Sequence, residues 1–347
     1  MYDLEGVGAM FRALAEIDYR NRSPLYEQLA LAAADDPDVL SLVLPAAPTD
    51  RYPHLLMAAV QYLLLGEGSS PLEAFGSSDP YPTFRAWCLA HRAEIEALTG
   101  RRVVQTNEVA RCAGLVPCFA AVADASDGRP LALLEVGASA GLNLLFDRYR
   151  YDFGPSASMG LPDAPVVIRP RMEGPPPAIG AMPEVSWRRG LDRNPVDVTS
   201  DEDVRWLRAC IWPEQQARRD LLDRAVAVAR QSPPTVLRGD ALETVSELAA
   251  TAPADAVLCV YHTAVLAYLP DPAKFAERLA EVAETRPLWW VSGEPPGFVA
   301  PLAGQTVPLP EGAHLVFQYG IVPLNLPGHE PRTLASADPH GIWCASA

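Results

Sequence analysis

One stretch of the sequence combines small, polar and acidic residues at a spacing that could bind a ligand. Residues 131–144 read LALLEVGASAGLNL. The run begins with apolar residues typical of a buried strand, continues through small residues that favour a tight turn, and ends at the start of a predicted helix. Such a turn brings backbone N–H groups and a helix N-terminus close to a ligand. We therefore expect this stretch to form part of a binding or catalytic site.

The spacing of the polar residues in this stretch fits two kinds of active site. Glu135-x-Gly137-x-Ser139-x-Gly141 resembles the first motif of class I S-adenosylmethionine-dependent methyltransferases. Gly137-x-Ser139-x-Gly141 also has the spacing of the nucleophile elbow of the α/β-hydrolases, with Ser139 as the nucleophile. A nicotinamide or flavin site is less favoured, because its fingerprint needs glycine where Ser139 stands. The elements around the motif must therefore decide between the first two.

Composition limits the compartment and the partners. The chain has 347 residues, 49% of them hydrophobic, which is enough for one large domain or two of ordinary size. It has no apolar run of the ~20 residues that span a membrane and no start typical of a secretory signal, so we expect a cytoplasmic protein. The net charge of −15 disfavours a nucleic-acid substrate, because a phosphate backbone repels an acidic chain. The cysteines form no CxxC pair or Cys/His cluster, and we expect no metal site.

The first 128 residues are predicted to form a helical region. Amphipathic or apolar stretches typical of helices cover 10–17, 25–34, 54–65, 84–98 and 105–123. Turn residues then precede the apolar run of the motif, so we divide the chain into a helical region at 1–128 and an α/β domain at 129–347.

From residue 129 onward, strands and helices are predicted to alternate. Helices are expected at 140–148, 200–230, 242–249 and 275–282. Strands are expected from 131 to 135, from 185–187 toward the segment at 190–195, and at 235–240, 256–261 and 288–291. An insertion at about 149–184 is expected to be a hairpin or a lid, and residues 314–322 and 341–344 a final antiparallel pair. Strands separated by helices indicate a parallel sheet covered on both faces. We therefore predict an α/β fold with a Rossmann-like sheet of the class I methyltransferase type, mostly parallel with an antiparallel last strand.

Polar residues follow four of the predicted strands, where ligands of such sheets bind. Glu135 ends the first strand, and Asp192 follows the second, where a carboxylate can accept two hydrogen bonds from ribose hydroxyls. Asp240 follows the third strand and resembles the acidic residue that meets the adenine amino group in methyltransferases. Tyr261 and His262 follow the fourth strand, where contacts to the methyl acceptor usually lie. These positions in this order favour the methyltransferase interpretation.

Each of these residues also has a purely structural interpretation. Gly137 and Gly141 could simply allow a helix and a strand to pack closely. Asp192 could form an Asx turn, and Asp240 could cap the helix that follows it. His262 could be a core histidine whose hydrogen bonds are satisfied.

The hydrolase interpretation needs an acid and then a histidine after Ser139. Asp240 or Asp271, followed by His314 or His340, supplies that order. The upstream region reads as helical, however, whereas the hydrolase fold places several strands before its elbow. No His-Gly-Gly segment precedes the motif, and the acids that end the first two strands would have no role.

An upstream segment, QTNEVAR at 105–111, is the remaining candidate. It reads as a helix start, with Thr106 or Asn107 as the N-cap. A helix here would pack just before the first strand and could close over a cofactor. Arg111 could pair with the carboxylate of the methionine part of S-adenosylmethionine, since a guanidinium suits a bidentate partner. Asn107, and Asn143 within the motif segment, join the candidate cofactor-binding residues.

Five segments carry a family resemblance. They are QTNEV at 105–109, EVGASAGLNLL at 135–145, DRYRY at 147–151, GLDRNPVDV at 190–198 and WPEQ at 212–215. On these segments the chain, from about residue 10 to about 345, is similar to an uncharacterised bacterial family catalogued as domain of unknown function 2332. The resemblance implies a helical N-terminal part and a methyltransferase-like sheet, and it implies no established reaction.

We predict a protein that binds S-adenosylmethionine and transfers its methyl group to a small molecule or a protein side chain. A non-catalytic protein on the same scaffold is an alternative, because fold does not imply activity. The candidate catalytic residues are His262, as a general base where the acceptor must lose a proton, and Tyr261. The candidate cofactor-binding residues are Glu135, Gly137, Ser139, Gly141, Asn143, Asp192, Asp240, Arg111 and Asn107.

Overall fold

The computed structural model describes residues 4–155, 157–178, 180–305, 309–313 and 315–346. The chain divides into two compact units. The first comprises Met1–Thr106 and Ser200–Asp220, and the second comprises Asn107–Thr199 and Leu221–Ala347. Each unit has a hydrophobic core of its own.

The described part of the first unit is helical. Its elements are α1 (Leu4–Leu14), η1 (Ala15–Tyr19), α2 (Pro24–Ala33), α3 (Pro37–Leu40), η2 (Ser41–Val43), η3 (Pro48–Asp50), α4 (Pro53–Gly66), α5 (Pro71–Phe75), α6 (Tyr81–Ala90), α7 (Arg92–Thr99) and α9 (Asp201–Ala209). Caps and prolines fix where three of them begin. Ser23, Asp36 and Ser70 each accept a backbone N–H at the start of α2, α3 and α5, and each is followed by proline, whose fixed φ suits the first helical position.

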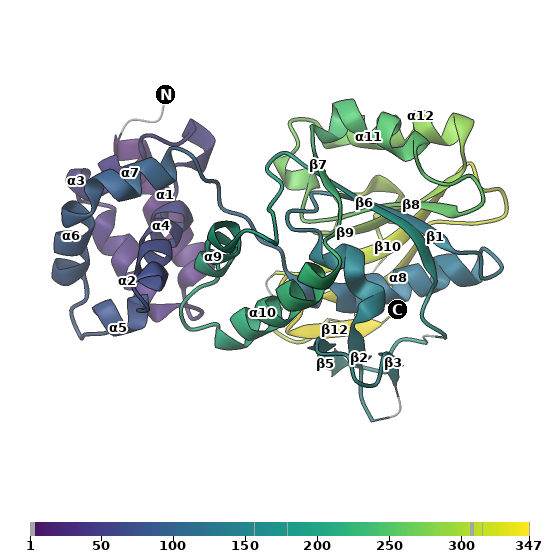
Figure 1. Cartoon of the computed structure of the whole chain (residues 1–347), viewed down its shortest axis with the longest axis horizontal. Coiled ribbons are helices and arrows are strands. Elements are labelled where there is room, and N and C mark those ends of the chain that lie inside the picture. Colours follow the sequence, from purple (N-terminus) through teal and green to yellow (C-terminus); the bar gives the residue numbers. More distant parts are fainter. Residues whose placement is uncertain (1–3, 156, 179, 306–308, 314, 347) are drawn as a thin grey trace. The chain divides into compact units, whose positions relative to one another are not determined.

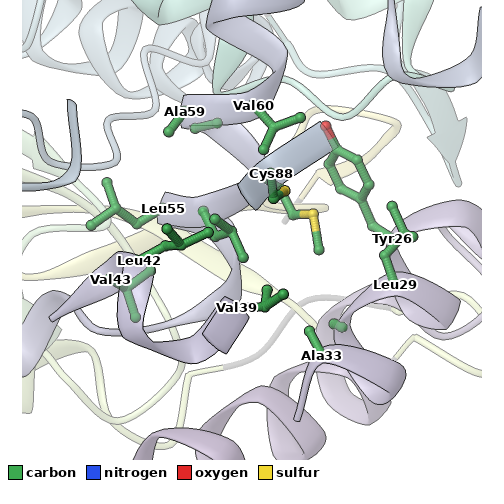
Figure 2. Packing of buried hydrophobic residues seen from close by; sticks show 14 of the residues in the cluster. Tyr26, Leu29, Ala33, Val39, Leu42, Val43, Leu55, Ala59, Val60 and Cys88 are labelled. Atoms are coloured by element: carbon green, nitrogen blue, oxygen red, sulfur yellow. The ribbon is translucent and has the colours of Figure 1, made fainter. Parts of the chain in front are cut away.

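The core of the first unit forms between the apolar faces of its helices. Figure 2 shows Tyr26 and Leu29 of α2 on the same side of this cluster as Ala33, and Leu55 of α4 on the other side. Gln61 of α4 is a buried polar side chain that links distant segments of this unit. It accepts from the Tyr26 hydroxyl at 2.6 Å and donates to the carbonyls of Arg208 and Ile211 at 3.1 and 2.7 Å, just where α9 ends. Gln61 thus satisfies helix-end carbonyls that would otherwise be buried without a donor.

The second unit is built on a sheet of nine strands (Figure 1). These are β1 (Leu131–Val136), β5 (Arg171–Glu173), β6 (Val185–Asp192), β7 (Val236–Arg238), β8 (Val257–Thr263), β9 (Leu288–Glu294), β10 (Phe317–Leu324), β11 (Arg332–Ala337) and β12 (Trp343–Ser346). The order across the sheet is β5-β12-β11-β10-β9-β8-β1-β6-β7. Strands β1, β6, β7, β8 and β9 are parallel, and β10, β11 and β12 follow as an antiparallel series.

Helices and short turns of the second unit connect and cover these strands. They are η4 (Val109–Arg111), α8 (Cys112–Asp124), η5 (Leu142–Arg148), α11 (Ala241–Ala250), η6 (Leu266–Tyr268), α12 (Pro272–Thr285) and η7 (Ala300–Leu302), while α10 (Gln216–Gln231) runs across the unit boundary. Strands β2 (Arg150–Asp152), β3 (Ser158–Gly160) and β4 (Val167–Ile168) form a separate small sheet.

The two faces of the large sheet receive different side chains. All residues of β1, β8 and β9 are buried, which requires cover on both faces. One face packs against α11 and α12, and α8 packs against β9, β10 and β11 on the other (Figure 1). Because side chains alternate along a strand, Glu135 and its register partner Tyr261 point to the α8 side, whereas His262 points to the α12 side.

The α/β class, the large mostly parallel sheet and the helical N-terminal part confirm the coarse prediction. The grouping of two segments differs from the predicted division at 128/129. Residues 107–128 group with the sheet, because α8 packs on it, and residues 200–220 group with the N-terminal helices.

The segment after the motif was predicted as an α-helix at 140–148, and the structure has 3-10 turns there. Several of its carbonyls accept hydrogen bonds from side chains outside the segment instead of from the next helical turn. Arg188 donates to the Leu144 carbonyl and pairs with Asp147, and the Tyr149 hydroxyl donates to the Leu142 carbonyl. Tertiary hydrogen bonds therefore override the local helical pattern.

The predicted final antiparallel pair is wrong. Strands β10 and β12 are not neighbours, because β11, which the sequence analysis missed, pairs with both. The predicted start of the pair, His314, lies outside the described residues. The insertion at 149–184 forms the small sheet β3-β2-β4 and strand β5, which extends the large sheet beside β12.

Tyr319 of β10 packs between two glycines, and this contact is open to test. A Cβ added to Gly114 of α8 would lie 2.5 Å from the Tyr319 ring, and one added to Gly293 of β9 would lie at the same distance from its other edge. We expect Gly114→Ala to lower the free energy of unfolding by about 1–3 kcal/mol through overpacking, as measured by urea denaturation. Gly180→Ala, where a Cβ would meet nothing within 4 Å, is the control. Equal stability of the two variants would contradict this account of the packing.

Candidate functional site

The turn after β1 has a left-handed backbone at every second residue. The φ angles are +73° at Gly137, +52° at Ser139 and +69° at Gly141. Glycine adopts such angles without strain, whereas serine rarely does. The turn is tied to β6 and the loop that follows it: the Gly137 N–H donates to the Leu191 carbonyl at 2.8 Å, and the Val196 N–H donates to the Ser139 carbonyl at 3.1 Å. Its shape is therefore fixed by the neighbouring strand.

Both glycines of the turn also face other parts of the protein closely. A Cβ on Gly137 would lie 2.4 Å from a methyl group of Val265, and one on Gly141 would lie 2.8 Å from the Pro234 ring. Gly137 and Gly141 are therefore needed both for close packing and for the left-handed backbone of the turn.

Asp192, at the end of β6, holds this turn in place. Its Oδ2 accepts the Ser139 N–H at 2.7 Å, and its Oδ1 accepts the Asn194 N–H at 2.7 Å in an Asx turn. A carboxylate has about four lone-pair sites, so each oxygen can accept one further hydrogen bond. Asp192 therefore forms the Asx turn that the sequence offered as an alternative, and its carboxylate can still accept hydrogen bonds from a ligand.

Glu135 is a buried acid at the end of β1, with an exposure of 1%. Its Oε2 has no hydrogen-bond partner among the described residues, and neither do the buried Tyr261 hydroxyl and Ser139 Oγ. Burial raises the pKa of Glu135 to about 8, against the opposing effects of the Tyr261 and Asn143 side chains. Three polar atoms thus lie inside the protein near the turn with unused hydrogen-bonding capacity.

Arg111 is a buried base close to the same strand ends, with an exposure of 7%. Its Nε donates to the Pro339 carbonyl at 2.9 Å, its Nη1 lies 3.4 Å from the carbonyl and hydroxyl oxygens of Thr263, and the guanidinium lies over the Phe317 ring at 5.3 Å. The ion pairs found among the described residues do not include Arg111. Its positive charge lowers the pKa of Glu135. A buried guanidinium without a carboxylate is a natural anion site.

The two asparagines connect the turn to the segment that carries Arg111. Asn107 Oδ1 accepts the Leu142 N–H at 3.3 Å, and Asn143 Oδ1 accepts from the Cys112 thiol at 3.4 Å. Both residues therefore position the turn against η4 and α8.

Asp240, at the end of β7, caps the helix that follows it. Its Oδ1 accepts the Leu242 N–H at 2.8 Å, and its Oδ2 pairs with the Arg193 guanidinium at 2.5 and 3.1 Å. The hydrogen bond from Arg193 holds the pKa of Asp240 below its usual value. The predicted capping role applies, and the ionised carboxylate lies next to the loop that contains Asp192.

His262 is not placed for the general-base role that the sequence suggested. It is fully buried, the Trp290 indole N–H donates to its Nε2 at 2.9 Å, and its Nδ1 lies 2.7 Å from Glu294 Oε1. Because the indole can only donate, Nε2 accepts and Nδ1 carries the proton. Both nitrogens are engaged, which is the satisfied core histidine that the sequence analysis kept as an alternative.

Glu294, which the sequence analysis missed, ends β9 and supports the loop after β8. Its Oε1 accepts the backbone N–H groups of Val265 and Leu266 at 2.7 and 3.1 Å. Burial would raise the pKa of Glu294, but the hydrogen bonds from His262 and from this loop bring it below its usual value. Because Val265 contacts Gly137, Glu294 indirectly supports the turn after β1. An acid three residues after the apolar run at 288–291 was the signal that could have revealed it.

The hydrolase interpretation lacks a histidine at Ser139. Ser139 Oγ has no hydrogen-bond partner in the described chain. His340 Nδ1 instead lies 3.4 Å from Glu108 Oε2, and Asp271 caps α12 through the Ala273 N–H. The other candidate, His314, lies outside the described residues.

The described residues contain no cluster of three or more His, Cys, Asp or Glu side chains that could hold a metal ion. Among the same residues, no helix has both the length and the apolar character needed to cross a bilayer.

The chain belongs to a family of uncharacterized proteins conserved in bacteria, DUF2332, whose sequence profile matches residues 8–345. No curated protein and no solved structure matches the chain.

The buried Glu135 carboxyl makes stability depend on pH. The folded protein holds this proton up to about pH 8, whereas the usual pKa is 4.5. The free energy of unfolding therefore falls as the pH rises through this window, by up to about 1.4 kcal/mol per unit. We expect Glu135→Gln to remove this loss, so that the variant gains on the wild type between pH 5 and pH 8 in urea denaturation. Glu247→Gln, at an exposed position of α11, is the control, and its free energy of unfolding should change with pH as that of the wild type does. If the free energy of unfolding changed with pH in the same way for all three proteins, the burial of an unpaired acid would be contradicted.

Proposed function

We propose that this protein binds S-adenosylmethionine at the carboxyl ends of β1, β6 and β8 and transfers its methyl group to an acceptor. The observation that carries the proposal is the position of the turn at 137–141. It follows β1, which lies between β6 on one side and β8 on the other. Counted along the chain, the five parallel strands have the order 3-2-1-4-5, so the order reverses at β1. Open α/β sheets bind their ligands at such a reversal.

Acidic side chains at the ends of three adjacent strands support a nucleoside ligand. Glu135 ends β1, Asp192 ends β6, and Asp240 follows β7. The carboxylates of Asp192 and Asp240 retain acceptor sites that ribose hydroxyls and an adenine amino group could use. The β1 turn and these acids lie at the same edge of the sheet, because β1, β6 and β7 are parallel.

The buried charges next to the turn fit the methionine part of the cofactor. That part carries an ammonium and a carboxylate group. The Glu135 carboxyl and the Tyr261 hydroxyl have unused acceptor sites, and Arg111 is a buried cation with no ion pair in the described chain. An acid and a base in these positions complement the two charges of an amino-acid head group.

The chain's own part in the reaction would be to bind, to orient and to exclude water. When bound, S-adenosylmethionine supplies a methyl carbon activated by its sulfonium. Alignment of an acceptor with that carbon can supply several kcal/mol of rate acceleration. Glu135, Arg111 and the turn would fix the cofactor end, whereas His262 would contribute only to the core. The net charge of −15 favours a small molecule or a protein side chain over nucleic acid as the acceptor, and the free cysteines suit a reducing cytoplasm.

A serine hydrolase is the second candidate, because Ser139 has the strained backbone of a nucleophile elbow. Attack by Ser139 needs a base at Oγ, and the described residues offer none. We therefore rank this candidate below the methyltransferase.

Calorimetric titration with S-adenosylhomocysteine tests the proposed function. We expect binding in the micromolar range, about −8 kcal/mol. Asp192→Ala should weaken it at least tenfold, because the Ser139 N–H loses its acceptor and the turn loosens. Asp197→Ala is the matched control, since it removes an Asx turn to Thr199 in the same loop. Circular dichroism should show that both variants remain folded.

Absence of binding by folded wild-type protein would discard the proposal. The hydrolase candidate would then be examined with a fluorophosphonate probe, where labelling that disappears in Ser139→Ala would support it.

A further inference from the structure

Glu135 is surrounded by side chains from every element around the end of β1. Tyr261 of β8 is its register partner, and Asp192 lies at the end of the adjacent β6. Arg111 of η4 acts on it from the α8 side. The other groups near it are Asn143 of η5, Cys112 at the start of α8, and Tyr149. None of these forms an ion pair with Glu135, and its Oε2 is buried without a hydrogen bond within the described residues.

Two charges near Glu135 act in opposite directions. Arg111 favours an ionised Glu135, whereas the carboxylate of Asp192 opposes it. Cys112 and Tyr149 remain neutral at physiological pH, because burial raises the pKa of both groups well above the usual values. A carboxylate removed from water without a cation partner is costly, and such a group normally keeps its proton.

We propose that Glu135 is protonated in the ligand-free protein and that an α-amino-acid head group expels this proton when it binds. This inference rests on the proposed function for the identity of the ligand. The ammonium group of the ligand supplies the cation that Glu135 lacks, and the ligand carboxylate accepts from the Arg111 guanidinium. The same ligand thus provides a partner of opposite charge for the ionised Glu135 and for Arg111, neither of which has an ion pair among the described residues without it.

The step balances without any further reactant. The O–H bond of the Glu135 carboxyl breaks, and the proton passes to solvent. The ligand ammonium keeps its three protons, and one of its N–H groups donates a hydrogen bond to the new carboxylate. The ligand carboxylate accepts from Arg111, which stays charged throughout. One proton per ligand is therefore released where Glu135 begins fully protonated, and affinity for the head group rises with pH until Glu135 ionises by itself.

Calorimetry in two buffers of different ionisation enthalpy measures this proton directly. We expect S-adenosylhomocysteine to release close to one proton at pH 6.5 and progressively fewer as the pH rises past the pKa of Glu135 in the ligand-free protein, which is about 8. Methylthioadenosine, which shares the nucleoside but lacks the head group, should release none. Glu135→Gln should abolish the release and weaken S-adenosylhomocysteine at least tenfold, while its affinity for methylthioadenosine stays within twofold of wild type.

Each other outcome separates the inference from the proposed function. Binding of S-adenosylhomocysteine without proton release, or with release that persists in Glu135→Gln, overturns the inference and leaves the proposed function standing. If neither nucleoside binds, the proposed function fails. The same two-buffer titration with L-methionine, which carries only the head group, then decides the inference. Release of a proton that depends on Glu135 supports it, and no binding or binding without release overturns it.

Discussion

Strand β1 is hydrogen-bonded on both sides, to β6 and to β8, and all six of its residues are buried. Its side chains alternate between a face covered by α11 and α12 and a face on the side of α8. This arrangement leaves no route by which Glu135 can reach solvent, because a shift of one residue would exchange every side chain between the two faces. The acid is therefore held inside the protein by the burial of the strand, and the surroundings at the strand end must accommodate it.

The turn after β1 depends on the same pairing. Gly137 bonds to the Leu191 carbonyl of β6, and Ser139 donates to Asp192 at the end of that strand. On the β8 side, Val265 packs against Gly137. Glu294 accepts the Val265 N–H and so holds the loop that carries Val265, and His262 hydrogen-bonds to the same carboxylate. Acids at the ends of β6 and β9 thus support the turn from both sides. Loss of either carboxylate would release backbone N–H groups in a partly buried place, where an unpaired donor costs about 1–3 kcal/mol.

Local pattern was enough to predict the parallel strands and the polar residues at their ends. The apolar runs of β1, β8 and β9 are continuous because both faces are covered, and that signal is visible in the sequence. It could not reveal that Arg188, Tyr149 and Tyr151 donate to the carbonyls of Leu144, Leu142 and Phe146, since these are side-chain hydrogen bonds set by the tertiary fold. Strand β11 was missed because its sequence, RTLASA, has one large apolar residue and no clear apolar run. The partners of His262, Trp290 and Glu294, could not be predicted because they come from another strand.

The difference between His262 and Glu135 shows how burial separates structural from ligand-binding polar groups. Both are buried residues at the ends of adjacent strands, His262 on β8 and Glu135 on β1. His262 has a donor for one nitrogen and an acceptor for the other, so no ligand could improve its hydrogen bonding. Glu135 retains an oxygen without a partner, and the nearby Arg111 is a cation without an ion pair in the described chain. Native proteins seldom leave buried polar atoms unpaired, and these two groups on the α8 side of the sheet are therefore the basis of the ligand site that we propose.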